Sequence, residues 1–95
     1  MTGKFDPGIQ VFVREIKATT HVRTPHYVRG KTGVVVRELG CYRNPEQLAY
    51  GADGLPLVPL YHVSFSQHDL WPDYAGERHD TAVIEIYEHW LEQAR

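Results

Sequence analysis

The sequence is short of cysteine and of long apolar runs, and each shortage excludes a class of protein. Cys41 is the only cysteine among 95 residues, so the chain forms no internal disulfide and no metal cage of its own cysteines. No apolar run approaches the roughly 20 residues needed to span a bilayer. The first six residues also lack the apolar core of a signal peptide. We therefore expect a soluble, cytoplasmic protein with no membrane partner.

An excess of basic residues is lacking too. Ten Lys and Arg stand against twelve Asp and Glu, which gives a net charge of −2 and a pI near 6.3. A general phosphate-binding surface needs clustered positive charge, so nucleic acid is disfavoured as the main partner. Apolar residues make up 42% of the chain, enough for one thin core. We expect residues 1–95 to form a single domain whose stability depends partly on a partner.

The chain contains four short segments of strand character, residues 10–16, 33–39, 61–65 and 81–87. The run Val34-Val35-Val36 favours a buried strand, and in the last segment we expect Val83 and either Ile84 or Ile86 to face inward. Gly30 and Gly33 predict a tight turn, and residues 51–59 a long loop. Residues 46–50 and 67–70 suit helical turns, and residues 87–93 suit a short helix or an edge strand. The pattern predicts an all-β fold, a small SH3-like, partly open barrel with long loops and a short C-terminal helical turn.

The most informative stretch is residues 21–33, in which Arg23 and Arg29 flank Pro25. Proline restricts its own φ and biases Thr24 towards extended geometry, so this loop is stiffer than most. Arginine suits oxyanions because its planar fork donates two parallel hydrogen bonds and stays charged. The alternative is that both arginines are solvated or pair with acidic residues of the same chain.

This stretch resembles the C-terminal domain of the nitrile hydratase β subunit, whose members carry His-x-Arg-x-Pro-x-Tyr-x-Arg-Gly-x-x-Gly. Every fixed position is present: His21, Arg23, Pro25, Tyr27, Arg29, Gly30 and Gly33. Residues 5–14, 59–65 with Leu70-Trp71, and 86–92 are similar to further family segments in the same order. The resemblance therefore covers almost the whole chain.

The resemblance implies a β-type subunit of a multi-subunit lyase that hydrates nitriles to amides and is inactive alone. It implies that Co(III) or Fe(III) is held by a partner α subunit, two of whose cysteine ligands are oxidised, and that this chain binds no cofactor. Arg23 matches an arginine that hydrogen-bonds to those oxidised sulfurs. We expect His21, Tyr27, Arg29 and Trp71 at the interface, with His21 orienting its own loop.

The sequence departs from the family in lacking the helical N-terminal half of the β subunit, so we expect a second β-like chain to supply it. Ile9 and Phe12 also stand where charged residues are common. Thiocyanate hydrolase, which is built from separate β-like chains, is an alternative identity. A maturation factor that escorts the α subunit is another.

Other candidates have plain explanations. None of the six histidines (His21, His26, His62, His68, His79 and His89) forms a spaced metal-binding pair, so we expect no metal in this chain. Cys41 has no motif that would activate its thiol. Trp71 and Trp90 suit core or interface packing. Residues 28–35 also look like the Gly-x-x-Gly-x-Val turn of RNA-associated SH3-like modules, which keeps an RNA-binding module as a further alternative.

Overall fold

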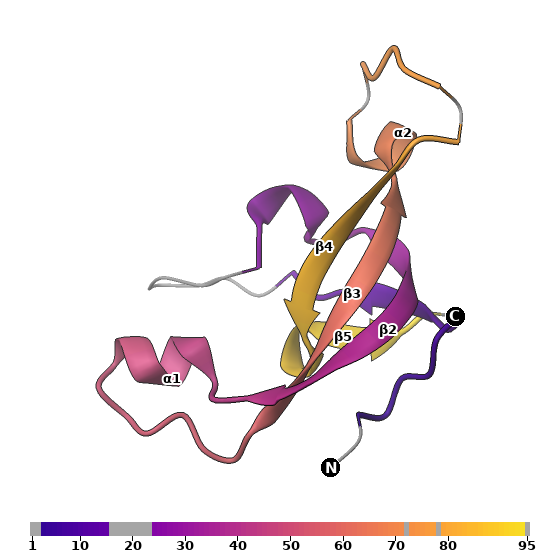
Figure 1. The fold of residues 1–95 in the computed structure, drawn as a ribbon. Coiled ribbons are helices and arrows are strands. Elements are labelled where there is room, and N and C mark those ends of the chain that lie inside the picture. The colour runs from indigo at the N-terminus through magenta and orange to yellow at the C-terminus, as the bar shows by residue number, and fades with distance from the viewer. Residues whose placement is uncertain (1–2, 16–23, 72, 78, 95) are drawn as a thin grey trace.

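Five antiparallel strands form one sheet in this computed structural model, which describes residues 3–15, 24–71, 73–77 and 79–94 (Figure 1). The strands are β1 (Gln10–Val13), β2 (Thr32–Tyr42), β3 (Val58–Ser66), β4 (Thr81–Tyr87) and β5 (Leu91–Gln93). Their order in the sheet is β4-β3-β2-β1-β5. The predicted all-β fold is confirmed, and the sequence pattern found four of the five strands.

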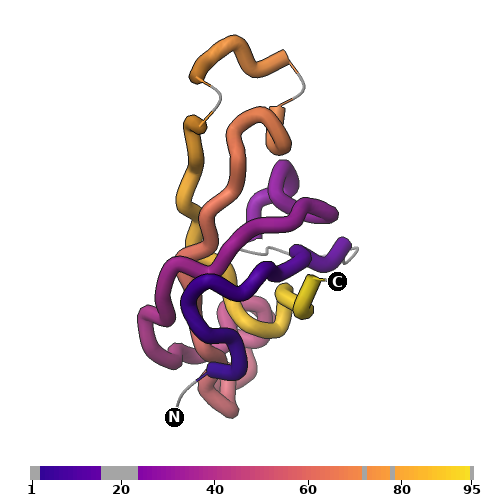
Figure 2. The backbone as a smooth tube through the Cα atoms, turned by 90° about the vertical axis from the view of Figure 1, so that its right-hand side faces the viewer, coloured from indigo at the N-terminus to yellow at the C-terminus, as the bar shows by residue number. Residues whose placement is uncertain are grey.

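The sheet is strongly curled. β4 and β5 follow one another in the chain but lie at opposite edges of the sheet. β4 and β5 are joined only by η2 (Glu88–Trp90), a single 3-10 turn. Four chain steps reach at most about 15 Å, whereas the edges of a flat five-stranded sheet are about 19 Å apart. The register shifts between Val35 and Arg37 and between Glu38 and Gly40 mark bulges in β2, which help to bend it. The result is a partly open barrel, whose backbone Figure 2 shows from the side.

The core lies on the concave side of this sheet. Val11, Val35, Val63, Phe65 and Ile86 are at most 1% exposed. Strand residues two apart share a face, so the period-two alternation in the sequence selects these side chains. The remaining core residues are Phe5, Val13, Val28, Tyr61, Leu70, Trp90 and Leu91.

Two inward predictions for the strands are wrong. Val83 is 52% exposed, because it shares the outer face with Glu85, while Ala82, Ile84 and Ile86 turn to the core. The run Val34-Val35-Val36 is not buried as a whole, since Val34 and Val36 point outward and only Val35 points inward.

Two short helices extend from the ends of the long strands. α1 (Pro45–Ala49) begins where the side chain of Asn44 accepts hydrogen bonds from two backbone N–H groups, with proline at its first turn. α2 (Gln67–Leu70) follows β3 directly. Both turns were predicted. The expected loop at residues 51–59 ends earlier, because β3 already includes Pro59 opposite Cys41. The pairing of β3 with β4 stops at Leu60, so Pro59 lies where β3 has an open side.

The C-terminal segment combines both predicted forms, the turn η2 and then the edge strand β5. β5 pairs with β1 through Val11, Phe12 and Val13. Among the residues that the structure describes, no helix is long and apolar enough to cross a membrane.

Candidate functional site

The loop from Thr24 to Gly30 is held firmly against the barrel. Pro25 is extended, and it leads into the 3-10 turn η1 (His26–Val28), whose Val28 is fully buried. Thr24 is the only buried polar residue among those described. Gly30 adopts a φ of +78°, which favours glycine, and its N–H donates to the carbonyl of Val13 at 2.8 Å. Both ends of this loop are therefore fixed by the fold itself.

Arg29 braces the loop from inside. Its Nη2 donates to the carbonyl oxygen of Thr24 at 2.8 Å, and its guanidinium carbon lies 4.9 Å from the ring centroid of Trp90. A guanidinium over an indole face is attracted by the ring's electrons, and the attraction grows where water is excluded. No ion pair within the described part of the chain includes Arg29. Within the described part of the chain, Arg29 therefore supports the loop and is neither a purely solvated charge nor half of an ion pair.

Tyr27 and Trp71 form an aromatic pair on the surface. Their ring centroids are 5.0 Å apart with a tilt of 36°, and the two side chains are 39% and 42% exposed. The indole Nε1 of Trp71 donates to the side chain of Gln67 at 2.9 Å, which fixes its orientation. A rigid, half-exposed aromatic pair is typical of residues that anchor protein interfaces.

A partly buried polar cluster lies behind Arg29. Glu46 Oε1 accepts from Trp90 Nε1 at 2.6 Å and lies 2.7 Å from His89 Nε2. Burial raises the pKa of Glu46, but the hydrogen bonds from His89 and Trp90 outweigh it and bring that pKa below its ordinary value. The sequence analysis did not identify Glu46, and it gave His89 no role because that residue is in no spaced metal-binding pair. The only local signal was the helix start at Asn44-Pro45, which says nothing of a partner 43 residues away.

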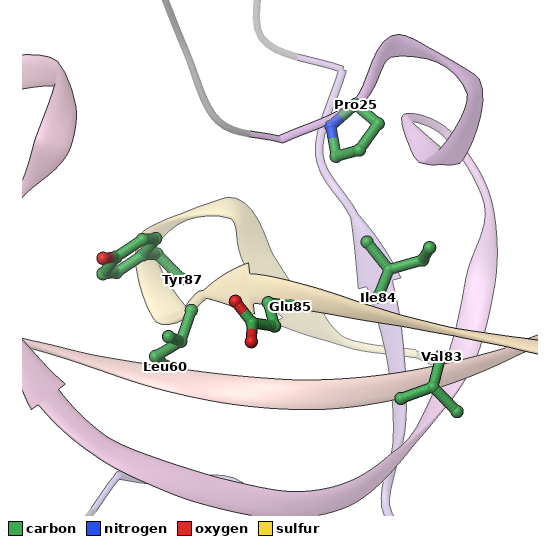
Figure 3. A pocket seen from close by; sticks show the side chains of 6 residues that line it. All are labelled: Pro25, Leu60, Val83, Ile84, Glu85 and Tyr87. Carbon is green, nitrogen blue, oxygen red and sulfur yellow. The ribbon is translucent and has the colours of Figure 1, made fainter.

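A cavity of about 400 Å³ lies between Pro25 and the edge strand β4 (Figure 3). Its lining is mostly apolar and includes Leu60, Ile84 and Tyr87, with the carboxylate of Glu85 as its charged group. This volume is at the small end of ligand pockets. Among the described residues, no group of three or more His, Cys, Asp or Glu is placed so that it could hold a metal ion.

Of the other residues named from the sequence, only those in the described part of the chain can be placed. His21 and Arg23 lie outside the described residues. Cys41 is partly buried in β2. His62 bridges Glu85 and Arg37 on the outer face, at 3.7 and 3.3 Å. The structure thus brings together Tyr27, Arg29 and Trp71 around one loop.

Comparison with known proteins points to one family. The family model described as nitrile hydratase beta subunit, C-terminal, matches residues 1–93. A nitrile hydratase subunit beta from Pseudomonas chlororaphis is 36% identical over 99% of this chain and 43% of its own length. A thiocyanate hydrolase subunit alpha from Thiobacillus thioparus is 36% identical over 96% of this chain and 72% of its own.

A solved structure gives the same answer for the fold. A chain of recombinant apo thiocyanate hydrolase from Thiobacillus thioparus superposes with a TM-score of 0.91 at 34% identity, covering 98% of this chain and 78% of that one. This chain spans less than half of the nitrile hydratase subunits beta that it matches. With a family match over nearly every residue, the chain belongs to the family formed by the C-terminal domain of the nitrile hydratase β subunit.

Proposed function

We propose that this chain is a β-type subunit of a multi-subunit nitrile hydratase, converting nitriles to amides with a metal held by an α-type partner. The observation that carries the proposal is the family match over residues 1–93, which includes the full loop motif. The cobalt-containing nitrile hydratases among the relatives support a metal in the complex. When bound in the partner, the metal supplies Lewis-acid activation for hydration.

In this proposal the loop faces the α-type subunit, and Arg23 donates hydrogen bonds to oxidised cysteines there. Oxygens on sulfur carry negative charge in a buried place, where a planar two-pronged donor is stabilising. The braced backbone at Thr24 supports this role, because it fixes the residue that follows Arg23 in the sequence. Arg29 holds the loop, and His21 orients it.

Two exposed apolar surfaces support a permanent assembly. The first is the Tyr27–Trp71 pair. The second is the segment that leads from the end of β2 to β3 in the chain, where five large side chains are 41–67% exposed: Tyr42, Leu48, Tyr50, Leu55 and Leu57. Exposed apolar groups mark protein contacts where they form a contiguous patch. We assign the first to the α-type subunit and the second to a β-like chain that supplies the rest of the β subunit.

Arg23→Lys provides a direct test of the arginine's role. The substitution keeps the charge but replaces a planar fork with a point charge. We expect the assembled enzyme to lose about 10- to 100-fold in turnover, as is typical for partners of metal ligands. Unchanged turnover in a complex that still assembles would refute the assignment.

The assembly is tested by purifying a tagged chain from its native cells, with metal analysis and a nitrile hydration assay. We expect a stoichiometric complex with an α-type subunit, a second β-like chain and cobalt or iron. A metal-free, substoichiometric α-type partner would replace the proposal with a maturation factor. Recovery of RNA would replace it with an RNA-binding module.

Thiocyanate hydrolysis is the second candidate, and the TM-score of 0.91 to thiocyanate hydrolase favours it. The purified complex separates the two by substrate. Release of an amide from a nitrile supports the first proposal, and consumption of thiocyanate without nitrile hydration supports the second.

A further inference from the structure

Three buried polar atoms without a hydrogen-bond partner lie in one place. Among the side chains that the structure describes, these atoms are Arg29 Nε, Glu46 Oε2 and His89 Nδ1. All three residues contact Trp90 or a residue bonded to it. These three atoms mark one polar cluster that is packed around Trp90.

The contacts run in a line from α1 to the loop. Glu46, on α1, accepts from the indole N–H of Trp90. The Trp90 ring lies under the guanidinium of Arg29, which in turn donates to the carbonyl of Thr24. Arg14, the residue after β1, ties the same turn to the end of that strand, because its backbone N–H donates to the Trp90 carbonyl at 2.9 Å. Thr24 and Arg14 are thus both attached to η2.

We propose that Glu46 is a positioning residue for the loop: it fixes the Trp90 indole, which fixes Arg29, which sets the backbone at Thr24. The inference rests on the proposed function only for its consequence in catalysis, since the contacts themselves are internal. Glu46 acts through Trp90 and touches neither the loop backbone nor a substrate.

Three features of Glu46 suit it to this task. Its side chain is only 18% exposed, so its hydrogen bonds are little weakened by water. One oxygen, Oε1, receives both donors, so the rings of His89 and Trp90 are oriented by a single atom. The helix that carries Glu46 is capped by Asn44, whose side chain accepts a hydrogen bond from the backbone N–H of Glu46 and so fixes the backbone from which the carboxylate extends. An apolar residue would pack at this position without orienting the indole.

The test compares three variants by their spectra and their turnover. Glu46→Ala removes the acceptor, Glu46→Gln keeps an acceptor oxygen, and Gln47→Ala changes the exposed neighbour on the same helix. The first readout is the indole N–H resonance of Trp90 together with amide hydrogen exchange at Arg29 and Gly30. The second is kcat and KM of the assembled complex.

We expect Glu46→Ala to shift the Trp90 resonance, to speed exchange at both amides, and to lower kcat about tenfold with little change in KM. Glu46→Gln should restore most of each property, and Gln47→Ala should match the unmodified chain. If Glu46→Ala does not fold, Trp90→Phe takes its place, because it keeps a ring under Arg29 but removes the N–H. Trp90→Phe should then speed the same two amides.

Unchanged exchange at Arg29 and Gly30 in Glu46→Ala would overturn the inference whatever the enzyme does. Loss of kcat in Glu46→Gln equal to that in Glu46→Ala would also overturn it, since the acceptor oxygen is kept. If the proposed function is wrong, the complex of the unmodified chain hydrates no nitrile and consumes no thiocyanate. The hydrogen-exchange result still decides the role of Glu46 in that case, so the two failures can be told apart.

Discussion

Replacing Gly33 with alanine should destabilise the fold through a steric clash between β2 and β3. A Cβ at this position would lie 2.7 Å from the carbonyl oxygen of Ser64 and from a methyl group of Val63, and 2.8 Å from the ring of Phe65. Val63 and Phe65 are core residues at most 1% exposed, and the oxygen belongs to a paired strand, so none can withdraw easily. Overpacking of this kind costs about 2 to 3 kcal/mol. In a chain of this size the unfolding midpoint should fall by roughly 10 to 20 °C.

Gly8 provides the control, because it separates the effect of backbone conformation from that of space. Gly8 has a φ of +91°, and a Cβ there would meet nothing within 4 Å. Gly8→Ala should therefore cost only about 1 to 2 kcal/mol, from the conformation alone. Thermal unfolding followed by circular dichroism measures both variants. A Gly33→Ala chain as stable as the parent, or less affected than Gly8→Ala, would refute the close approach of β2 and β3.

Three more predictions concern titration and assembly. The lowered pKa of Glu46 means that its ionised form stabilises the fold above its ordinary value of 4.5, and that this stability is lost as the pH falls. Urea unfolding of the parent and Glu46→Gln should therefore converge between pH 6 and pH 3, and a constant difference would contradict the hydrogen bonds. Burial and the 2.6 Å hydrogen bond to Glu88 raise the pKa of Tyr61, so its neutral form stabilises the fold at neutral pH and this stability is lost above pH 10. Tyr61→Phe should be less stable by about 1 to 3 kcal/mol at pH 7 and should approach the parent above pH 10; unfolding midpoints at both pH values check this. Trp71→Ala should weaken the proposed complex about tenfold or more in Kd, as for an interface anchor, with little loss of fold stability; equal affinity by calorimetry would remove Trp71 from the interface.

The fold could be read from the sequence where one local pattern decides it. Residues 81–87 were predicted with the observed bounds, because β-branched residues are dense there and follow a stretch that contains turn-formers. The face of Val83 was predicted wrongly. The apolar residues Val83, Ile84 and Ile86 fall on both faces of the strand, and the sequence alone does not say which face meets the core; the register with β3 decides it. β5 pairs over three residues, too few for periodicity to separate a strand from a helical turn.

The site was harder to predict, because its contacts join residues that are far apart in the sequence. The motif brought attention to Arg29, but the sequence contains no signal that Trp90 lies beneath it, 61 positions later. Glu46 and His89 meet only because η2 returns the chain from β4 to β1 past α1. Pairings of this kind depend on how the sheet curls in three dimensions, and no local sequence pattern contains that information.

The motif residues divide into two groups once their contacts are known. Pro25, Arg29, Gly30 and Gly33 each serve the fold directly, through a stiff turn, a brace, a positive φ and a close strand approach. Tyr27 does not: it is 39% exposed, and its aromatic contact is with the equally exposed Trp71. Folding alone does not require a half-exposed aromatic pair beside a loop that is already fixed by internal hydrogen bonds. The half-exposed Tyr27–Trp71 pair therefore supports the proposed contact of this loop with another protein, and Arg23 stays a prediction whose test lies in that complex.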